Sequence, residues 1–181
     1  MRKVIHKLFW AWDFDREEKW LNDMAVKGLA LVSVGLFRYE FEDCVPGEYR
    51  ICLEFLEHGP FGRVENAKYI EFLEETGAQH VGTFMRWAYF RKKAAQAGFD
   101  LFSDYDSRIR HLTRIIRCIA LVCALDLYWS GYDLFLYIRW RVPIGLAGAA
   151  VCLLLAILGA VGLARLVRKR QRLKSEQRIF E

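Results

Sequence analysis

The sequence has few of the residues from which catalytic and metal sites are usually built. Its four histidines are His6, His58, His80 and His111, and no two of them have the HxxxH or HExxH spacing of a helical metal site. It also has no glycine-rich phosphate loop, no GxSxG nucleophile elbow and no set of kinase motifs. We therefore predict no catalytic residue, no metal site and no cofactor, and we do not expect an enzyme.

Cysteine is present, but not in the number or spacing of a disulfide framework. The five cysteines include no CxxC pair, and three of them lie in apolar stretches. Free thiols are typical of a reducing compartment. No cleavable signal peptide is expected, because Lys7 interrupts the apolar residues of the start MRKVIHKLFWAW, and Asp13 and Asp15 follow it. The first part of the chain should therefore stay in the cytoplasm.

Charge is unevenly distributed along the chain. Residues 1–107 hold 14 Lys and Arg against 18 Asp and Glu, a net charge of −4, whereas residues 108–181 hold 13 against 4, a net charge of +9. A nucleic-acid-binding domain normally has a basic face on its folded surface. Because the first half is mildly acidic, we expect no nucleic-acid partner.

Two apolar stretches indicate a membrane protein. Residues 142–164 contain 23 positions without a charge, which is enough for a helix to cross the ~30 Å hydrocarbon core at ~1.5 Å per residue. A second stretch, 115–138, is interrupted by Asp126 and Asp133. Few residues separate the two stretches. We predict transmembrane helices over 115–138 and 142–164 that form an antiparallel hairpin.

Basic residues flank this hairpin asymmetrically. Four arginines, at 108, 110, 114 and 117, lie before or at the start of the first stretch, and seven Lys and Arg follow the second, in the tail 165–181, whereas the connecting turn has only Arg139 and Arg141. Positive charge is retained on the cytoplasmic side of a membrane. We therefore predict a multi-pass protein of the inner (plasma) membrane with both termini in the cytoplasm. The tail is expected to act as a stop-transfer signal or, alternatively, to bind anionic lipid headgroups.

Residues 1–92 are predicted to form an α+β domain. Alternating apolar and polar residues predict strands over 4–12, 29–42, 48–57 and 79–91, and helical periodicity predicts helices over 15–27 and 65–76. The order βαββαβ is typical of a ferredoxin-like sandwich, with four antiparallel strands and two helices on one face. Residues 93–114 are expected to be a connector and juxtamembrane helix.

Charged residues alternate with apolar ones on the predicted sheet, and five of them are candidates for a polar face: Arg38, Glu40, Arg50, Glu54 and Arg86. Cross-strand ion pairs on a solvated face would explain them. The alternative is a surface that binds a ligand or a protein partner.

Three polar residues share one face of the first predicted span, because Ser130 and Asp133 follow Asp126 by four and seven positions. A carboxylate inside a bilayer is costly unless it is paired or protonated. We predict a polar seam that contacts a partner, an ion or a neighbouring subunit of a homo-oligomer. The alternative is a shifted span, with Asp133 at the interface and Asp126 beside a local polar group.

Small residues recur in the second span. Ala156, Ala160 and Ala164 follow each other at intervals of four, a spacing that places them on one side of a helix. They predict a weak packing stripe.

Three stretches of the sequence resemble the bacterial domain-of-unknown-function 2812 (DUF2812) family. They are KLFWAWDFDREEKWLNDMAVKGLALVSVGLFRYEFEDCVPGEYR, YIEFLEETGAQHVGTFMRWAYFRKK and FDLFSD, and the resemblance covers roughly residues 3–115. It implies a membrane protein whose domain precedes transmembrane helices. Members often sit beside PadR-like transcriptional regulators, which implies a role in regulation or envelope stress. The resemblance supplies no catalytic motif.

Together these features predict an integral membrane protein with a cytoplasmic interaction or sensor domain. Its expected partners are the lipid bilayer and a second protein, and its expected role is regulatory. The alternative is a small-molecule-binding or export accessory protein that uses the Trp and Tyr side chains of the α+β domain, such as Trp10, Trp12, Trp20 and Trp87.

Overall fold

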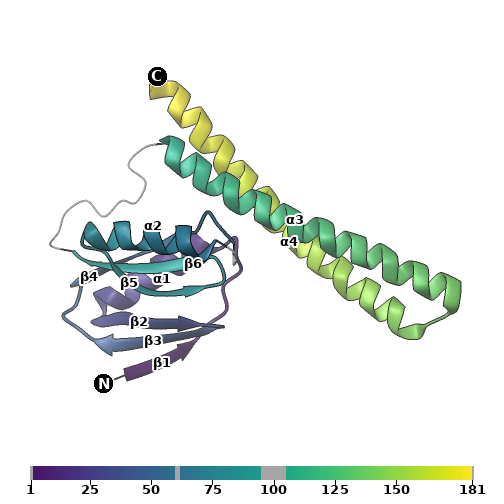
Figure 1. The fold of residues 1–181 in the computed structure, drawn as a ribbon, viewed down its shortest axis with the longest axis horizontal. Coiled ribbons are helices and arrows are strands. Elements are labelled where there is room, and N and C mark those ends of the chain that lie inside the picture. Colours follow the sequence, from purple (N-terminus) through teal and green to yellow (C-terminus); the bar gives the residue numbers. More distant parts are fainter. Residues whose placement is uncertain (1, 60–61, 95–104, 181) are drawn as a thin grey trace. The chain divides into compact units, whose positions relative to one another are not determined.

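The computed structural model describes residues 2–59, 62–94 and 105–180 and divides the chain into two units, 1–101 and 102–181 (Figure 1). The first unit contains β1 (Arg2–His6), α1 (Phe14–Val26), β2 (Leu29–Gly35), β3 (Arg38–Asp43), β4 (Tyr49–Phe55), α2 (Arg63–Glu75), β5 (Gln79–Phe84) and β6 (Trp87–Lys93). The second unit contains α3 (Tyr105–Trp140) and α4 (Pro143–Phe180). The predicted α+β class of the first unit is confirmed.

The first unit is built from two βαββ repeats. The strands pair in the orders β1-β3-β2, here called sheet A, and β4-β6-β5, here called sheet B. The helices begin at Phe14 and Arg63, which are 49 positions apart, and both have 13 residues. The strand registers repeat with the same shift, and each sheet has its irregularity at the equivalent place, after Leu31 in one and after His80 in the other.

This topology corrects the predicted ferredoxin-like order. Residues 29–42 and 79–91, each predicted as one strand, form hairpins that turn at Leu36–Phe37 and at Met85–Arg86. In both turns a bulky residue has a left-handed backbone, Phe37 and Met85 each at φ 56°. Such positions normally carry Gly or Asn, so the residue types gave no turn signal. The unit therefore has six described strands in two sheets.

Helix α1 lies between the two sheets (Figure 1). Its Trp20 packs edge-on against Tyr39 of sheet A, with ring centroids 5.1 Å apart. On the other side, Phe14 stacks on Trp87 of sheet B, also at 5.1 Å. The side-chain amide of Asn22 in α1 bonds to the backbone of Ile51 in β4. Its Nδ2 donates to the carbonyl oxygen of Ile51 at 2.8 Å, and its Oδ1 accepts from the backbone amide of Ile51 at 2.9 Å. One helix thus packs against one face of each sheet.

Helix α2 covers the opposite face of sheet B. There Leu73 packs with Phe90 and Ala88 of β6, whereas the alternate residues Trp87 and Tyr89 face α1. Sheet B is therefore buried on both faces. The corresponding second face of sheet A has exposed side chains on β1 and β3, including Arg2, His6 and Arg38.

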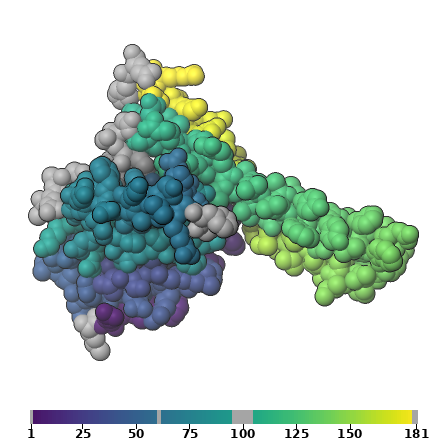
Figure 2. Space-filling model, viewed as in Figure 1, coloured from purple at the N-terminus to yellow at the C-terminus, as the bar shows by residue number. Residues whose placement is uncertain are grey.

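In the second unit α3 and α4 lie side by side and antiparallel (Figure 2). Near their connection, Ser130 Oγ donates to the carbonyl oxygen of Ala149 at 2.9 Å. At the opposite end, Gln177 Nε2 donates to Asp106 Oδ1 at 3.1 Å. The two helices therefore stay in contact over most of their length.

Small residues form the side of α4 that contacts α3. An added Cβ at Gly148 would lie 2.5 Å from Oδ2 of Asp133, and Gly159 lies against the sulfur of Cys123. Small side chains allow this close approach of two helices. The predicted alanine stripe is wrong in its register, because Ala156 is buried but the following alanines, 160 and 164, are exposed. A strict interval of four drifts around a helix of 3.6 residues per turn.

Among the described residues, one helix is long and apolar enough to cross a membrane, α4 over Pro143–Arg178. The other predicted span, 115–138, lies inside α3, which is not apolar enough by the same criterion of hydropathy. Hydropathy therefore supports one membrane helix rather than two. The outward faces of both helices are nevertheless apolar, since Tyr128 of α3 is 66% exposed and Ile144 of α4 is 79% exposed.

Candidate binding cleft

The five charged residues predicted for one sheet face are not brought together. Arg38 and Glu40 form an ion pair at 2.9 Å, but within β3 rather than across strands. Glu54 is fully buried on β4, on the side that faces α2. Arg50 is exposed near the start of β4, and Arg86 lies in the β5–β6 turn, where it donates to two backbone carbonyl oxygens. These residues therefore form no common surface.

The polar residues of the predicted membrane seam lie on the side of α3 that faces α4. Asp126, Ser130 and Asp133 are all half-buried. Ser130 bonds to the α4 backbone, and the carboxylate of Asp133 lies against Gly148. In the described residues this side of α3 is occupied by α4 itself.

A cleft that was not predicted opens in the first unit, with a volume of about 260 Å³. It is formed by the loop after β1, the first turns of α1 and the two hairpin turns. Its lining is almost entirely apolar or aromatic: Leu8, Phe9, Trp10, Ala11, Phe14, Glu17, Gly35, Leu36, Phe37, Tyr39, Phe84, Met85, Trp87 and Tyr89. We call it the aromatic cleft.

Glu17 is the charged residue of this lining, and it is 7% exposed. Its Oε1 accepts hydrogen bonds from the hydroxyls of Tyr39 at 2.7 Å and Tyr89 at 2.6 Å. No described residue donates a hydrogen bond to Oε2. Each tyrosine comes from a different sheet, so the carboxylate joins the two repeats.

Burial controls the protonation of this group. It raises the pKa of Glu17 above its usual value, while the hydrogen bonds from Tyr89 and Tyr39 offset part of that effect. Burial, together with the neighbouring Glu17, raises the pKa of both tyrosines strongly. Both hydroxyls therefore stay protonated and act as donors.

Aromatic rings next to Glu17 already hold a cation of the protein. Lys7 Nζ lies 4.9 Å from the ring centroid of Phe9 and 4.5 Å from that of Trp20. Phe9 lines the cleft and meets Tyr39 edge-on at 6.3 Å. The negative faces of these rings attract an ammonium group.

The rim of the aromatic cleft is apolar and exposed. Leu36 is 63% exposed, Phe37 47% and Met85 83%. Two of these residues, Phe37 and Met85, are the bulky residues whose backbone has a φ of 56°. Strained positions with exposed apolar side chains are uncommon and concentrate at functional sites. Two residues that line the aromatic cleft, Phe37 and Met85, thus combine a strained backbone with an exposed apolar side chain.

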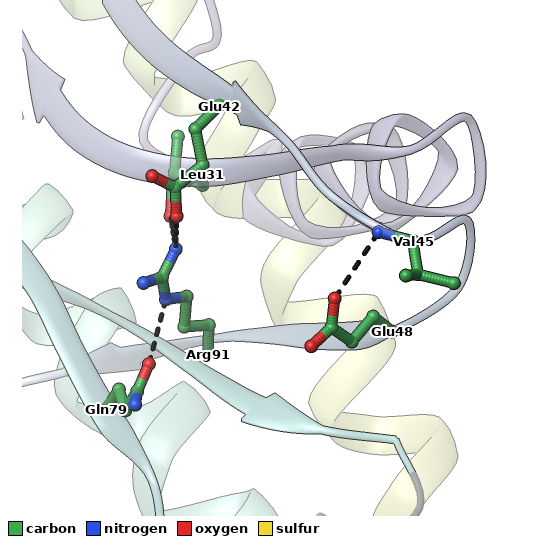
Figure 3. A network of polar contacts seen from close by, with 6 residues as sticks. All are labelled: Leu31, Glu42, Val45, Glu48, Gln79 and Arg91. Carbon is green, nitrogen blue, oxygen red and sulfur yellow. Dashed lines mark hydrogen bonds and ion pairs between the residues drawn. The ribbon is translucent and has the colours of Figure 1, made fainter. Parts of the chain in front are cut away.

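A second set of polar contacts joins the repeats at the other end of β6 (Figure 3). Arg91 Nη1 donates to Glu42 Oε1 at 2.8 Å and to the carbonyl oxygen of Leu31 at 3.2 Å, and its Nε donates to Gln79 at 3.0 Å. The guanidinium group is thus engaged with protein groups from both sheets. We assign these contacts a structural role.

The chain matches a family described as "Protein of unknown function (DUF2812)" over residues 13–125. No curated protein and no solved structure matches it. The matched segment runs from the start of α1 into α3, so it contains Glu17, Tyr39 and Tyr89 but not α4. Within the described residues no group of three or more His, Cys, Asp and Glu is placed to hold a metal ion.

Proposed function

The chain belongs to the DUF2812 family, and from the geometry of its cleft we propose that it is a membrane-anchored binding protein. In this proposal the α+β unit takes a small, largely apolar organic molecule in the aromatic cleft. The observation that carries the proposal is the cleft itself, an apolar hollow with one buried carboxylate and an exposed, strained rim. This is the composition of small-molecule sites, which are mostly apolar and have a few placed polar groups.

The membrane anchor is the α3–α4 pair. Its outward faces carry large apolar side chains between Leu121 and Val161, which a water-exposed helical hairpin would leave unburied. Each helix is ~55 Å long at ~1.5 Å per residue, longer than the ~30 Å core. We propose that both helices enter the inner membrane and that their basic ends, including 165–178, stay in the cytoplasm.

Binding is tested by calorimetric titration of the full chain in lipid nanodiscs with 4-phenylbutanol, a neutral aromatic probe, against empty nanodiscs as the blank. The double variant Phe37→Asn/Met85→Asn removes two rim side chains and supplies a residue that tolerates positive φ. We expect it to lose at least about tenfold in affinity while its thermal stability rises.

The matched control is Arg141→Asn, because Arg141 also has a positive φ, 52°, but lies in the connection between α3 and α4. It should gain stability without any change in probe binding. Equal binding by the wild type and the rim variant would contradict the proposed site.

A second candidate function is binding of a protein partner by sheet A, which would make the protein a regulatory adaptor. It is favoured by β1, an edge strand that pairs with β3 and has four exposed residues out of five. An exposed edge can accept a strand from another chain. Proline at Val4, whose side chain is 42% exposed, should abolish capture of such a partner and leave probe binding unchanged.

A further inference from the structure

We infer that the ligand of the aromatic cleft is an organic cation, an amine with an aromatic or aliphatic tail, whose ammonium group binds Oε2 of Glu17. This inference rests on the proposed function of the cleft as a binding site. It adds the charge and the chemical class of the molecule, and it assigns Glu17 as the residue that selects for them.

The carboxylate of Glu17 is incompletely compensated. It is 7% exposed, and the two tyrosine hydroxyls both donate to Oε1. No described residue donates to Oε2, although Glu17 belongs to the lining of the cleft. A buried charge is costly unless it is paired and hydrogen-bonded. An ammonium group supplies both the opposite charge and the missing donor.

In the part of the chain that the structure describes, the lining contains no second charged side chain that would compete for such a ligand, and Lys7 lies over the ring of Phe9 without being part of the lining. Among the described residues of the lining, Glu17 is the one carboxylic acid, and none is Lys, Arg or His. When Glu17 is ionised, the lining therefore carries one negative charge in apolar surroundings. An anionic ligand would be repelled, and a neutral one would gain a single hydrogen bond without compensating the charge.

The rings of the cleft suit the same ligand. Phe9 already accepts the ammonium group of Lys7 on its face, at 4.9 Å from the centroid. Trp87 and Phe14, which stack at 5.1 Å, offer an apolar wall on the side of α1 and sheet B. Rings of this kind attract a cation and also bury its hydrocarbon tail.

The test compares two probes of the same shape, 4-phenylbutylamine and 4-phenylbutanol, titrated calorimetrically into the full chain in nanodiscs of uncharged lipid at about pH 7.5. We expect the amine to bind about tenfold more tightly than the alcohol. In Glu17→Gln, which keeps the shape of the side chain, the ratio of affinities should fall to about one.

Glu18→Gln is the matched control. Glu18 is the next residue of α1, and burial raises its pKa too, but its Oε2 accepts from the backbone amide of Leu53 at 2.9 Å and it does not line the cleft. This variant should keep the preference for the amine.

The outcomes separate the inference from the proposed function. Equal affinity of the wild type for the two probes would overturn the cation inference and leave the binding site standing. Binding of neither probe would overturn both. If Glu17→Gln fails to fold, as judged by circular dichroism, the comparison of the two probes on the wild type still decides.

Discussion

The two βαββ repeats share topology and register, yet they bury different amounts of their sheets. On the face of sheet B that meets α1, β4 and β6 carry Ile51, Leu53, Phe55, Trp87 and Tyr89. The equivalent positions of sheet A, 49 residues earlier, carry Arg2, Val4, His6, Arg38 and Glu40. The reason is the position of α1, which covers one face of each sheet and leaves the second face of sheet A to solvent.

The aromatic cleft also depends on differences between the repeats. Glu17 of α1 corresponds to Asn66 of α2, and Tyr89 of β6 corresponds to Glu40 of β3. Only the first helix carries a carboxylate at this position, and only α1 has a sheet on both sides. The two repeats share their backbone topology, and the carboxylate and tyrosine of the cleft lie at positions where their residues differ.

The largest expected effect comes from a charge placed at equivalent positions of the two sheets. Leu53 is 2% exposed and faces α1, whereas its counterpart Val4 is 42% exposed. We expect Leu53→Asp to lower the free energy of unfolding by more than about 3 kcal/mol, since it buries an unpaired carboxylate. Val4→Asp should change it by less than about 0.5 kcal/mol. Denaturant unfolding of the full chain measures both, and similar losses would contradict the one-sided burial of sheet A.

Truncation of a core residue should also cost more stability in α1 than at the equivalent position of α2. Leu21 of α1 is fully buried between the sheets, whereas its counterpart Ile70 of α2 is half-buried against one sheet. Leu21→Ala should therefore cost about 3 kcal/mol and Ile70→Ala about 1 kcal/mol in unfolding free energy. Thermal and denaturant unfolding give these values. A larger loss for Ile70→Ala would show that α2, and not α1, carries the core.

The sequence predicted the two helices and β4 better than the hairpins, and the strand predicted over 4–12 ends at His6 in the structure. Alternation located the strands around Tyr39 and Ile51, because half-buried strands have a period of two. It missed both hairpin turns, since Phe37 and Met85 occupy positions where Gly or Asn is expected. Only a few equivalent residues are identical, such as Phe41 and Phe90, so the repeat was not visible either.

The candidate site was unpredictable for a related reason. Glu17, Tyr39 and Tyr89 are separated by 22 and 72 positions in their hydrogen-bonded pairs, and each reads in the sequence as an ordinary helix or strand residue. The signal that could have found them is Glu17 itself, an acidic residue on the same side of its helix as Leu21 and Met24. A charge within an apolar stripe is unusual. The sequence analysis instead placed the candidate binding surface on charged strand residues such as Arg38 and Glu40.

Glu17 should also make the stability depend on pH in a way that its counterpart Asn66 cannot. Because burial raises the pKa of Glu17 in the folded state above the unfolded value of 4.5, the folded protein binds this proton more tightly. Its contribution to stability is therefore complete below pH 4.5 and is lost as the pH rises through the folded pKa. The wild type should therefore gain stability relative to Glu17→Gln as the pH falls through the folded-state pKa of Glu17.

Denaturant unfolding of both proteins at pH values on either side of that pKa gives the difference directly. Glu18, whose pKa burial also raises, is present in both and cancels. A difference that stays constant with pH, or that grows as the pH rises, would contradict a buried carboxylate at this position.

The smallest effect concerns the ion pair between the repeats. Arg91 and Glu42 occupy equivalent positions and bond to each other at 2.8 Å, with side chains 19% and 43% exposed. Because the pair is partly solvated, a double-mutant cycle of Arg91→Met and Glu42→Gln should give a coupling of only about 0.5 kcal/mol. The pair Arg38–Glu40, more exposed at Arg38, is the control and should couple by less. A coupling of several kcal/mol would mean that charge holds the repeats together. A small one leaves that role to α1, whose Trp20 and Phe14 reach one sheet each.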